Sequence, residues 1–324
     1  MAPEPPEILV IHPGALGDVL QAVPALRALG RLDGGSHVTL AAQPRLGRLL
    51  AGPAVVDEAL SFDGLGLERL FADEPVPAVL AAQLGRAGRV VSWFGASDER
   101  YRERLRALVP SAVIAPPVPD NSFAGPVWQH LLATLAPWGV AASSCLSPLA
   151  LPEAWRALAR HALAGLGAEP ERPILAVHAG AGAVWKRWPA ADLARVIERA
   201  VGAMRCQVLV HQGPADHEAT TELHHALRER GAGRGALRLD EPDLPLLASV
   251  LQASTAFIGA DSGVSHLAAA VGTASVILFP QATRERWAPW SPTALPLRAI
   301  LPEGDVDRVA QALVARLDSS WGGV

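Results

Sequence analysis

Short apolar runs and amphipathic stretches alternate along the first half of the chain. Residues 8–12 read Ile-Leu-Val-Ile-His, a run rich in β-branched side chains that is typical of a buried parallel strand. A glycine-containing turn follows at residues 13–17, and from Asp18 onward apolar residues recur with helical spacing. With helical patterns between them, further strands are expected near residues 37–40, 55–60, 89–94 and 111–115. This alternation predicts a mostly parallel sheet.

The second half of the chain repeats the alternation after a loop rich in Pro, Gly, Ser and Asn at residues 116–126. A hinge is expected at residues 146–152 and 165–173. Strands are expected at residues 174–178, 206–211, 255–259 and 275–279, and helices at residues 153–164, 190–203, 215–230, 243–251, 264–271 and 305–317. The chain is therefore expected to be an α/β protein with two doubly wound, Rossmann-like domains, residues 1–150 and 151–324. They are expected to face each other across a cleft, with ligands at the carboxyl ends of the strands.

Composition narrows the class of protein. With 50% hydrophobic and 19% charged residues among 324, the chain is typical of a globular protein. A net charge of −4 gives no reason to expect a nucleic-acid partner. Its two cysteines, Cys145 and Cys206, cannot form a disulfide framework and fit a reducing compartment. The first residues lack the basic character of a signal peptide, and no run of about 18 apolar residues occurs. We therefore expect a cytoplasmic location.

Three loops between a strand and a helix are candidates for chemistry. The first is HPGALGD, residues 12–18, in which Gly14 and Gly17 permit a tight turn with exposed backbone amides. Asp18 then stands at the helix start, either as a simple helix cap or as a functional carboxylate. The loop fits neither the dinucleotide fingerprint nor the phosphate-binding P-loop.

The second loop is HAGAGAVWKRWP, residues 178–189, and it holds the only lysine among 28 basic residues, Lys186. The glycine-bearing segment around Gly180 leaves a strand, and Pro189 suits the first turn of a helix. A lysine ammonium at this place either is a solvated surface charge or meets a phosphate group.

The third loop opens GADSGVSHLAAAVG, residues 259–272. The amides at such a helix start and the positive end of the helix dipole suit a diphosphate, and Ser262 and Ser265 add hydroxyl donors. The simpler interpretation is ordinary capping by Asp261 or Ser262. His266 is either a packed helix residue or a ligand contact.

Other constellations do not indicate a site. Asp261, Ser262 and His266 have the residue types of a catalytic triad, but the flanking sequence lacks the G-x-S-x-G elbow. The histidines at positions 211, 217, 224 and 225 lack zinc spacing and are interpreted as decorating a helix face. The arginines at positions 100, 102, 104 and 106 are interpreted as a solvated face or, alternatively, as a contact for an anionic acceptor.

Together the three loops resemble glycosyltransferase family nine, the heptosyltransferases that build the lipopolysaccharide core. The resemblance rests on ILVIHPGALGDVLQAVPAL, VHAGAGAVWKRWP and FIGADSGVSHLAAAVGTASVILFP, which occur in the family's order over most of the chain. It implies a GT-B architecture, an N-terminal domain on the acceptor side, an ADP-sugar donor in the C-terminal domain, and inversion of the anomeric centre without a metal or cofactor. It also implies a glycolipid or other glycan acceptor and peripheral contact with the inner membrane surface.

The matching motifs carry the family's roles onto this chain. Asp18 takes the position of the catalytic base, and Lys186 that of the residue that binds the diphosphate. The donor-binding residues implied are Gly180, Lys186, Glu218, Asp261, Ser262, Gly263 and His266, and the acceptor-side loop holds Gly14 and Gly17. The stretch VVSWFGASDERYRERL departs from the family's acceptor motif, so the sugar, the acceptor and lipopolysaccharide itself are left open. A nucleotide-sugar epimerase and a non-catalytic sugar-nucleotide-binding module are the alternatives.

Overall fold

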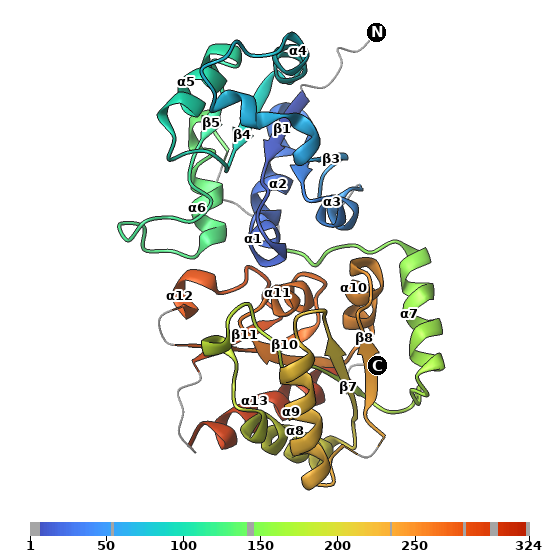
Figure 1. The fold of residues 1–324 in the computed structure, drawn as a ribbon. Coiled ribbons are helices and arrows are strands. Elements are labelled where there is room, and N and C mark those ends of the chain that lie inside the picture. Colours follow the sequence, from blue (N-terminus) through green and yellow to red (C-terminus); the bar gives the residue numbers. More distant parts are fainter. Residues whose placement is uncertain are drawn as a thin grey trace. The chain divides into compact units, whose positions relative to one another are not determined.

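The structure is a computed structural model that describes residues 7–52, 55–140, 146–233, 235–280, 283–298 and 304–321. The chain divides into two compact units, Met1–Leu146 and Ser147–Val324. Each unit is built around its own parallel sheet (Figure 1). Within the described ranges, none of the helices has the length and apolar character that a membrane span requires. The predicted α/β fold with two parallel sheets is thereby confirmed.

The sheet of the first unit has five strands in the order β3-β2-β1-β4-β5, all parallel. Its strands are β1 (Glu7–Ile11), β2 (His37–Ala42), β3 (Glu58–Ser61), β4 (Arg89–Ser92) and β5 (Val113–Ile114). The order places β1 at the centre, where apolar side chains bury both faces of the strand. Because β2 lies on one side of β1 and β4 on the other, the strand order reverses at β1.

The helices of the first unit connect these strands. They are α1 (Leu16–Gln21), α2 (Val23–Leu29), α3 (Pro44–Leu50), α4 (Ala78–Arg86), α5 (Glu99–Leu108) and α6 (Val127–Ala133), with 3-10 turns η1 (Leu32–Gly34), η2 (Asp63–Leu65), η3 (Leu67–Leu70) and η4 (Ala136–Trp138). One face of the sheet is covered by η2, η3, α4 and α5, whose apolar side chains join Leu9 and Ile11 in one core.

One sequence prediction for this unit is corrected. The helical pattern that begins near Asp18 forms two short helices, because Pro24 in the first turn of α2 has no amide to continue the ladder of α1. Among the four arginines of this stretch, Arg100 and Arg106 are exposed, as a solvated face predicts, but Arg100 and Arg104 also bond to backbone carbonyls of the segment before α4. Arg100 donates to the carbonyl of Phe71 at 3.2 Å, and Arg104 donates to the carbonyls of Ala72 and Glu74.

The sheet of the second unit has six parallel strands in the order β11-β10-β9-β6-β7-β8. Its strands are β6 (Ile174–His178), β7 (Gln207–Gln212), β8 (Leu237–Asp240), β9 (Ala256–Ala260), β10 (Ala274–Phe279) and β11 (Ala294–Arg298). The two edge strands escaped sequence prediction. β8 is short with alternating buried and exposed residues, and β11 contains Pro296, which argues against a strand unless it lies at an edge.

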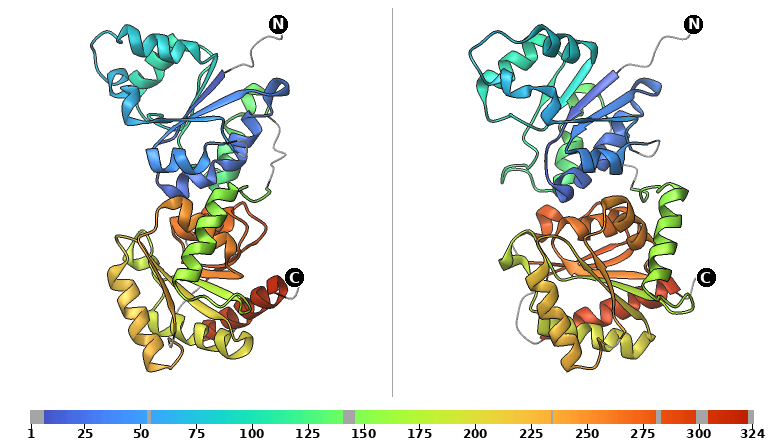
Figure 2. Two further views of the ribbon diagram at one scale, coloured as in Figure 1. Left: turned by 90° about the vertical axis from the view of Figure 1, so that its right-hand side faces the viewer. Right: turned by 45° about the vertical axis from the view of Figure 1, so that its right-hand side comes forward.

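Helices cover both faces of this sheet (Figure 2). They are α7 (Glu153–Gly165), α8 (Ala190–Met204), α9 (His217–Glu229), α10 (Leu244–Ala253), α11 (Gly263–Ala270), α12 (Arg284–Trp287) and α13 (Gly304–Trp321), with the 3-10 turn η5 (Val184–Lys186). Alternate residues of β10 face opposite layers. Val276 and Leu278 join the core under α8, α9 and α13, whereas Ile277 packs with Ala269 of α11.

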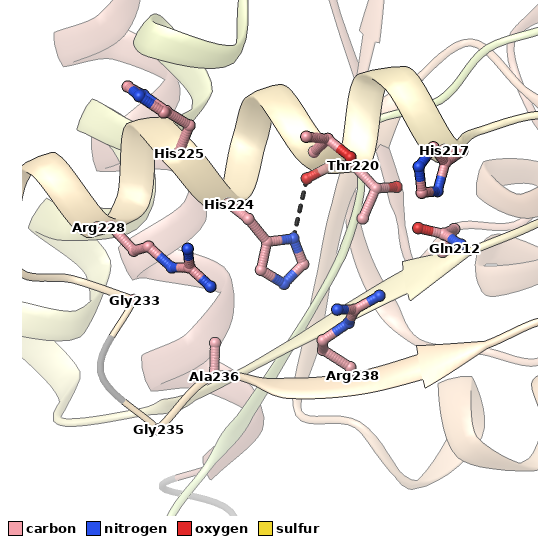
Figure 3. A pocket seen from close by; sticks show the side chains of 11 residues that line it. Gln212, His217, Thr220, His224, His225, Arg228, Gly233, Gly235, Ala236 and Arg238 are labelled. Carbon is pink, nitrogen blue, oxygen red and sulfur yellow. Dashed lines mark hydrogen bonds between the residues drawn. The ribbon is translucent and has the colours of Figure 1, made fainter.

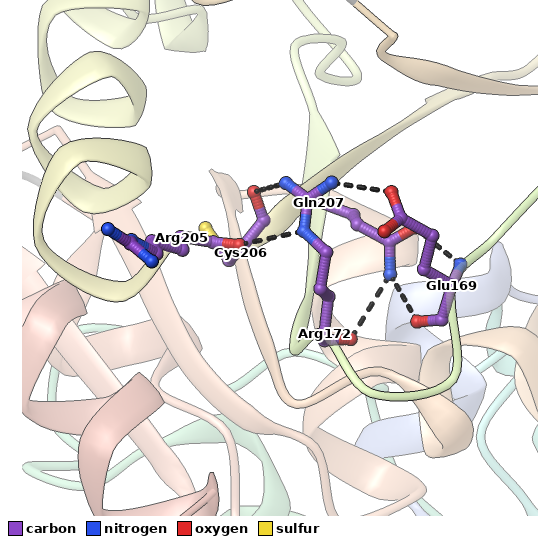
Figure 4. A network of polar contacts seen from close by, with 5 residues as sticks. All are labelled: Glu169, Arg172, Arg205, Cys206 and Gln207. Carbon is purple, nitrogen blue, oxygen red and sulfur yellow. Dashed lines mark hydrogen bonds and ion pairs between the residues drawn. The ribbon is translucent and has the colours of Figure 1, made fainter.

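A polar network ties residues 169–172, within a segment expected to be a hinge, to the start of β7 (Figure 4). The Gln207 amide group donates to the carbonyls of Glu169 at 2.7 Å and Arg172 at 3.1 Å, and it accepts from the Glu169 amide. Arg172 donates in turn to the Arg205 carbonyl at 3.0 Å. Neighbouring Cys206 is a buried free thiol, and burial raises its pKa to about 11. The other cysteine, Cys145, lies outside the described residues.

Candidate active site

The carboxyl ends of β6 and β9 define a switch point in the second sheet. These strands are neighbours, with His178 in register with Gly259. Chain connections run outward from them in opposite directions, to β7 and β8 on one side and to β10 and β11 on the other. Loops that leave two such strands diverge and open a crevice for a ligand. The loop after β6 carries Lys186, and the loop after β9 carries Asp261.

Lys186, Asp261 and His266 form one charged cluster at this point. Lys186 Nζ donates to Asp261 Oδ2 at 2.9 Å, and His266 Nε2 lies 3.5 Å from Asp261 Oδ1. The Asp261 side chain is only 4% exposed, whereas that of Lys186 is 23% exposed. The carboxylate thus holds the ammonium in place while the lysine still reaches solvent.

The charge of Asp261 is maintained by its partners. Burial favours the neutral acid and raises the pKa of this carboxyl, but hydrogen bonds and charges from His266 and Lys186 outweigh burial, so the pKa lies below its usual range. Asp261 is therefore ionised at neutral pH.

The start of α11 lies directly beside this cluster. Ser262 is its N-cap, because its hydroxyl accepts from the Ser265 amide at 3.3 Å, while the Ser265 hydroxyl donates to the Ala260 carbonyl. The amides of Gly263 and Val264 make no hydrogen bond with any described residue. Two free amides and the positive end of a helix dipole therefore stand next to the Lys186 ammonium, an arrangement suited to an anion.

The turn η5 presents an exposed apolar pair and a second ion pair beside Lys186. Val184 and Trp185 are 69% and 64% exposed, and Lys186 Nζ lies 5.6 Å from the centre of the Trp185 ring. The next residue, Arg187, donates to Glu218 Oε2 at 2.8 Å. Glu218 stands in the first turn of α9, so this ion pair links the Lys186 loop to that helix.

Gly180 packs against the partly buried side chain of Asp216. A Cβ at Gly180 would collide with the Asp216 carboxylate, which accepts from the Gly213 amide at 3.1 Å. Beneath it, Nδ1 of His178 and Nδ1 of His211 share a hydrogen bond of 3.1 Å. The interpretation of His211 as part of a helix face is wrong, because it lies buried in β7. Within the described residues, no group of three or more potential metal ligands occurs.

The buried histidine pair makes the second unit sensitive to acid. Burial lowers the pKa of His178 to about 4 and that of His211 to about 3, whereas an unfolded histidine titrates near about 6.5. The unfolded chain binds protons more readily, so stability present above about pH 6.5 is lost as the pH falls toward about 4. We expect the free energy of unfolding to decrease by up to about 1.4 kcal/mol per pH unit for each histidine, measured by chemical denaturation at successive pH values.

Two variants test the source of this acid sensitivity. His211→Gln removes one of the two buried rings and should flatten the pH dependence. His225→Gln removes a solvent-exposed histidine from α9 and should leave the dependence unchanged. An equal slope in the wild type and both variants would contradict the role of the buried pair.

In the first unit, the loop after β1 occupies the other switch point. Asp18 is the third residue of α1, and its Oδ2 accepts from the Ala15 amide at 3.1 Å. A Cβ at Gly14 would lie 2.8 Å from the His12 ring and 2.9 Å from Asp18 Cβ, so only glycine fits there. The Gln43 side-chain amide donates to the carbonyls of Pro13 and Gly14 at 3.3 Å each. The loop that presents Asp18 is therefore held from both sides.

The structure brings together some of the predicted site residues and separates others. Lys186, Asp261, Ser262, Gly263 and His266 meet in one cluster. Glu218 joins it only through Arg187, and Gly180 contacts Asp216. Asp18 and Gly14 belong to the first unit, as does Gly17, which lies inside α1 and not in the turn, because the helix already begins at Leu16.

Sequence reasoning missed His12, His178 and Asp216, which support the two loops from beneath. His12 is 1% exposed, and burial lowers its pKa to about 4, so it is neutral at physiological pH. Its Nδ1 accepts from the Gly14 amide at 3.3 Å. A signal was present, because each loop has a histidine at or directly after the end of a buried strand and a glycine two residues later.

Two parallel sheets, each with a candidate loop at its switch point, match the GT-B fold of solved heptosyltransferase structures. Residues 121–311, more than half of the chain, match the model of glycosyltransferase family 9 (heptosyltransferase). The chain belongs to glycosyltransferase family 9 and is a glycosyltransferase enzyme. Family membership sets aside the alternatives of an epimerase and a non-catalytic module.

Solved structures of this fold span nearly the whole chain. An ADP-heptose lipopolysaccharide heptosyltransferase II from E. coli is 20% identical, with a TM-score of 0.72 and coverage of 97% of this chain and 98% of that one. A family 9 glycosyltransferase from Veillonella parvula is 18% identical, with a TM-score of 0.76 and coverage of 98% and 99%. An E. coli heptosyltransferase solved with ADP is 15% identical, with a TM-score of 0.64 and coverage of 96% and 99%. No curated protein matches the chain significantly.

Proposed function

We propose that this enzyme transfers a heptose from ADP-heptose to an acceptor hydroxyl with inversion, in the synthesis of lipopolysaccharide core or a related glycan. The observation that carries the proposal is the position of Lys186 beside the free amides at the start of α11. An ammonium and two backbone donors match the negative charge of a diphosphate. Solved heptosyltransferases of this fold hold ADP and ADP-2-deoxy-2-fluoro heptose, which supports an ADP-sugar as the donor.

On the donor side, the cluster assists departure of the nucleotide. As the bond between the anomeric carbon and the diphosphate oxygen breaks, ADP leaves with the bonding electrons and gains negative charge. Lys186 and the amides of Gly263 and Val264 stabilise that charge without a divalent metal. Asp261 holds Lys186 in place, and His266 Nε2 lies 3.5 Å from the same carboxylate.

On the acceptor side, Asp18 acts as the general base. Its carboxylate takes the proton of the acceptor hydroxyl while the oxygen attacks the anomeric carbon from the side opposite the leaving group. A single displacement of this kind inverts the configuration. Asp18 belongs to the first unit and Lys186 to the second, so each unit supplies one of the two proposed catalytic groups. We further propose that the reaction takes place in the cytoplasm, on a glycolipid acceptor reached by peripheral contact with the inner membrane surface.

ADP is expected to stabilise the second unit against heat. At about one hundred times its dissociation constant, a ligand raises the free energy of unfolding by about 2.7 kcal/mol. Thermal unfolding with ADP, GDP and UDP at equal concentration measures the effect and shows which nucleobase the site prefers. Asp98→Asn, in the first unit and outside the proposed donor loops, serves as the control and should show the same shift as the wild type. Absence of a shift with every nucleotide would count against a nucleotide-sugar donor, and a preference for GDP or UDP would count against the adenine base.

A further inference from the structure

A groove runs along α9 and the edge strand β8 in the second unit. It encloses a cavity of about 360 Å³. Thr220, His224 and Arg228 line it from α9, and Arg238 lines it from β8. Figure 3 shows the guanidinium groups of Arg228 and Arg238 on either side of the His224 ring. None of the described residues that line the groove is acidic.

Two buried polar atoms in the groove lack a hydrogen-bond partner. Thr220 is 2% exposed, and its Oγ1 has no partner in the described part of the chain. His224 Nε2 is likewise buried and unpaired there, although Nδ1 of the same ring bonds the Thr220 carbonyl at 2.8 Å. Such atoms lose free energy when they are left unpaired, so buried polar groups without a partner point to a bound group that completes them.

The charge of the groove is positive. Arg228 forms no ion pair with any described residue, whereas Arg238 lies 3.1 Å from Asp240 Oδ2 and is partly neutralised. His224 Nδ1 must carry a proton to donate to the Thr220 carbonyl. With the proton on Nδ1, Nε2 is an acceptor, and it can accept from a P–OH or other hydroxyl group of the ligand.

We propose that this groove is a second ligand site, distinct from the loops at Lys186 and Asp261, that binds a phosphate group on a small molecule. Arg228 contributes a forked pair of donors that suits phosphate, and Arg238 faces it across the His224 ring. The Thr220 hydroxyl supplies a further hydrogen bond at the buried wall. The cavity exceeds what phosphate alone fills and is of the size that holds a small organic ligand, so a sugar phosphate is the expected form.

Calorimetric titration with inorganic phosphate and with glucose 6-phosphate tests the proposal. Ionic strength is held constant, and each titration is made both without ADP and with saturating ADP, which occupies the donor loops. Arg228→Gln is expected to weaken binding of these compounds about 10- to 100-fold, because a charge-assisted bond to phosphate is lost. Arg316→Gln, which removes an equal charge from α13, is the matched control and should bind like the wild type.

Thr220→Val separates the proposed contact from general folding effects. Because the Thr220 hydroxyl has no partner within the described residues, its removal should leave the free protein at least as stable. Phosphate binding should nevertheless weaken about threefold to tenfold. Equal affinity in Arg228→Gln and Arg316→Gln overturns the proposal. So does loss of phosphate binding on addition of ADP, or the failure of both compounds to bind the wild type at millimolar concentration.

Discussion

Asp18→Asn is expected to fold and to bind ADP like the wild type, and to turn over about 10²- to 10⁴-fold more slowly. The amide oxygen of asparagine can still accept from the Ala15 amide, so the start of α1 keeps its hydrogen bond. It cannot take the proton of an acceptor hydroxyl. Steady-state kinetics at saturating donor and acceptor, with release of ADP as the readout, measures the loss.

Asp98→Asn is the matched control in the same unit. Asp98 is the N-cap of α5 and accepts from the Tyr101 amide at 2.9 Å, so it has a capping role without a proposed role in catalysis. It should retain full turnover. If Asp18→Asn were as active as Asp98→Asn, Asp18 would be a structural residue and the base would have to be sought elsewhere.

Lys186→Ala is expected to lower turnover at saturating donor by about 10²- to 10³-fold, as is typical when a donor that stabilises developing charge is removed. A second effect follows from the contact with buried Asp261, which in the variant loses the Lys186 ammonium and keeps His266 as its ion-pair partner among the described residues. The pKa of Asp261 should then rise. Comparison of turnover with nucleotide affinity shows whether the ammonium acts mainly on the departing diphosphate.

The double variant Lys186→Ala/Asp261→Asn separates charge balance from catalysis. It removes both members of the ion pair, so it should be more stable than Lys186→Ala alone and remain slow. Recovery of turnover in the double variant would mean that Lys186 serves only to neutralise Asp261. Arg187→Ala, which breaks a neighbouring ion pair with exposed Glu218, is expected to have a much smaller effect.

The fold could be predicted because the strands and helices of each sheet have recognisable local patterns of apolar residues. Buried parallel strands such as β6 and β9 are continuous apolar runs, and the helices between them have apolar residues at helical spacing. The failures fall where local pattern is weak. Pro296 in β11 argues against a strand until its edge position is known, and Pro24 divides a helical pattern that otherwise reads as continuous.

The candidate site could be predicted only in part, because its contacts join distant segments. The sequence leaves Asp261 and Ser262 as equal candidates for the cap of α11. In the structure Ser262 caps the helix, and Asp261 binds Lys186, which lies 75 positions away. Likewise, nothing local to His211 reveals that it shares a hydrogen bond with His178, since that pairing depends on the adjacency of β6 and β7.

The edge strands of the two sheets are poor sites for pairing with a strand of another molecule. β3 and β5 have four and two residues, so they present few free backbone groups. On the other sheet, β8 carries exposed Arg238 and Asp240, and Pro296 of β11 has no amide to offer. Among the described strands, therefore, no edge presents a long, uninterrupted row of unpaired backbone amides and carbonyls to a neighbouring molecule. The enzyme is protected against aggregation by strand addition, even where many copies gather at high local concentration.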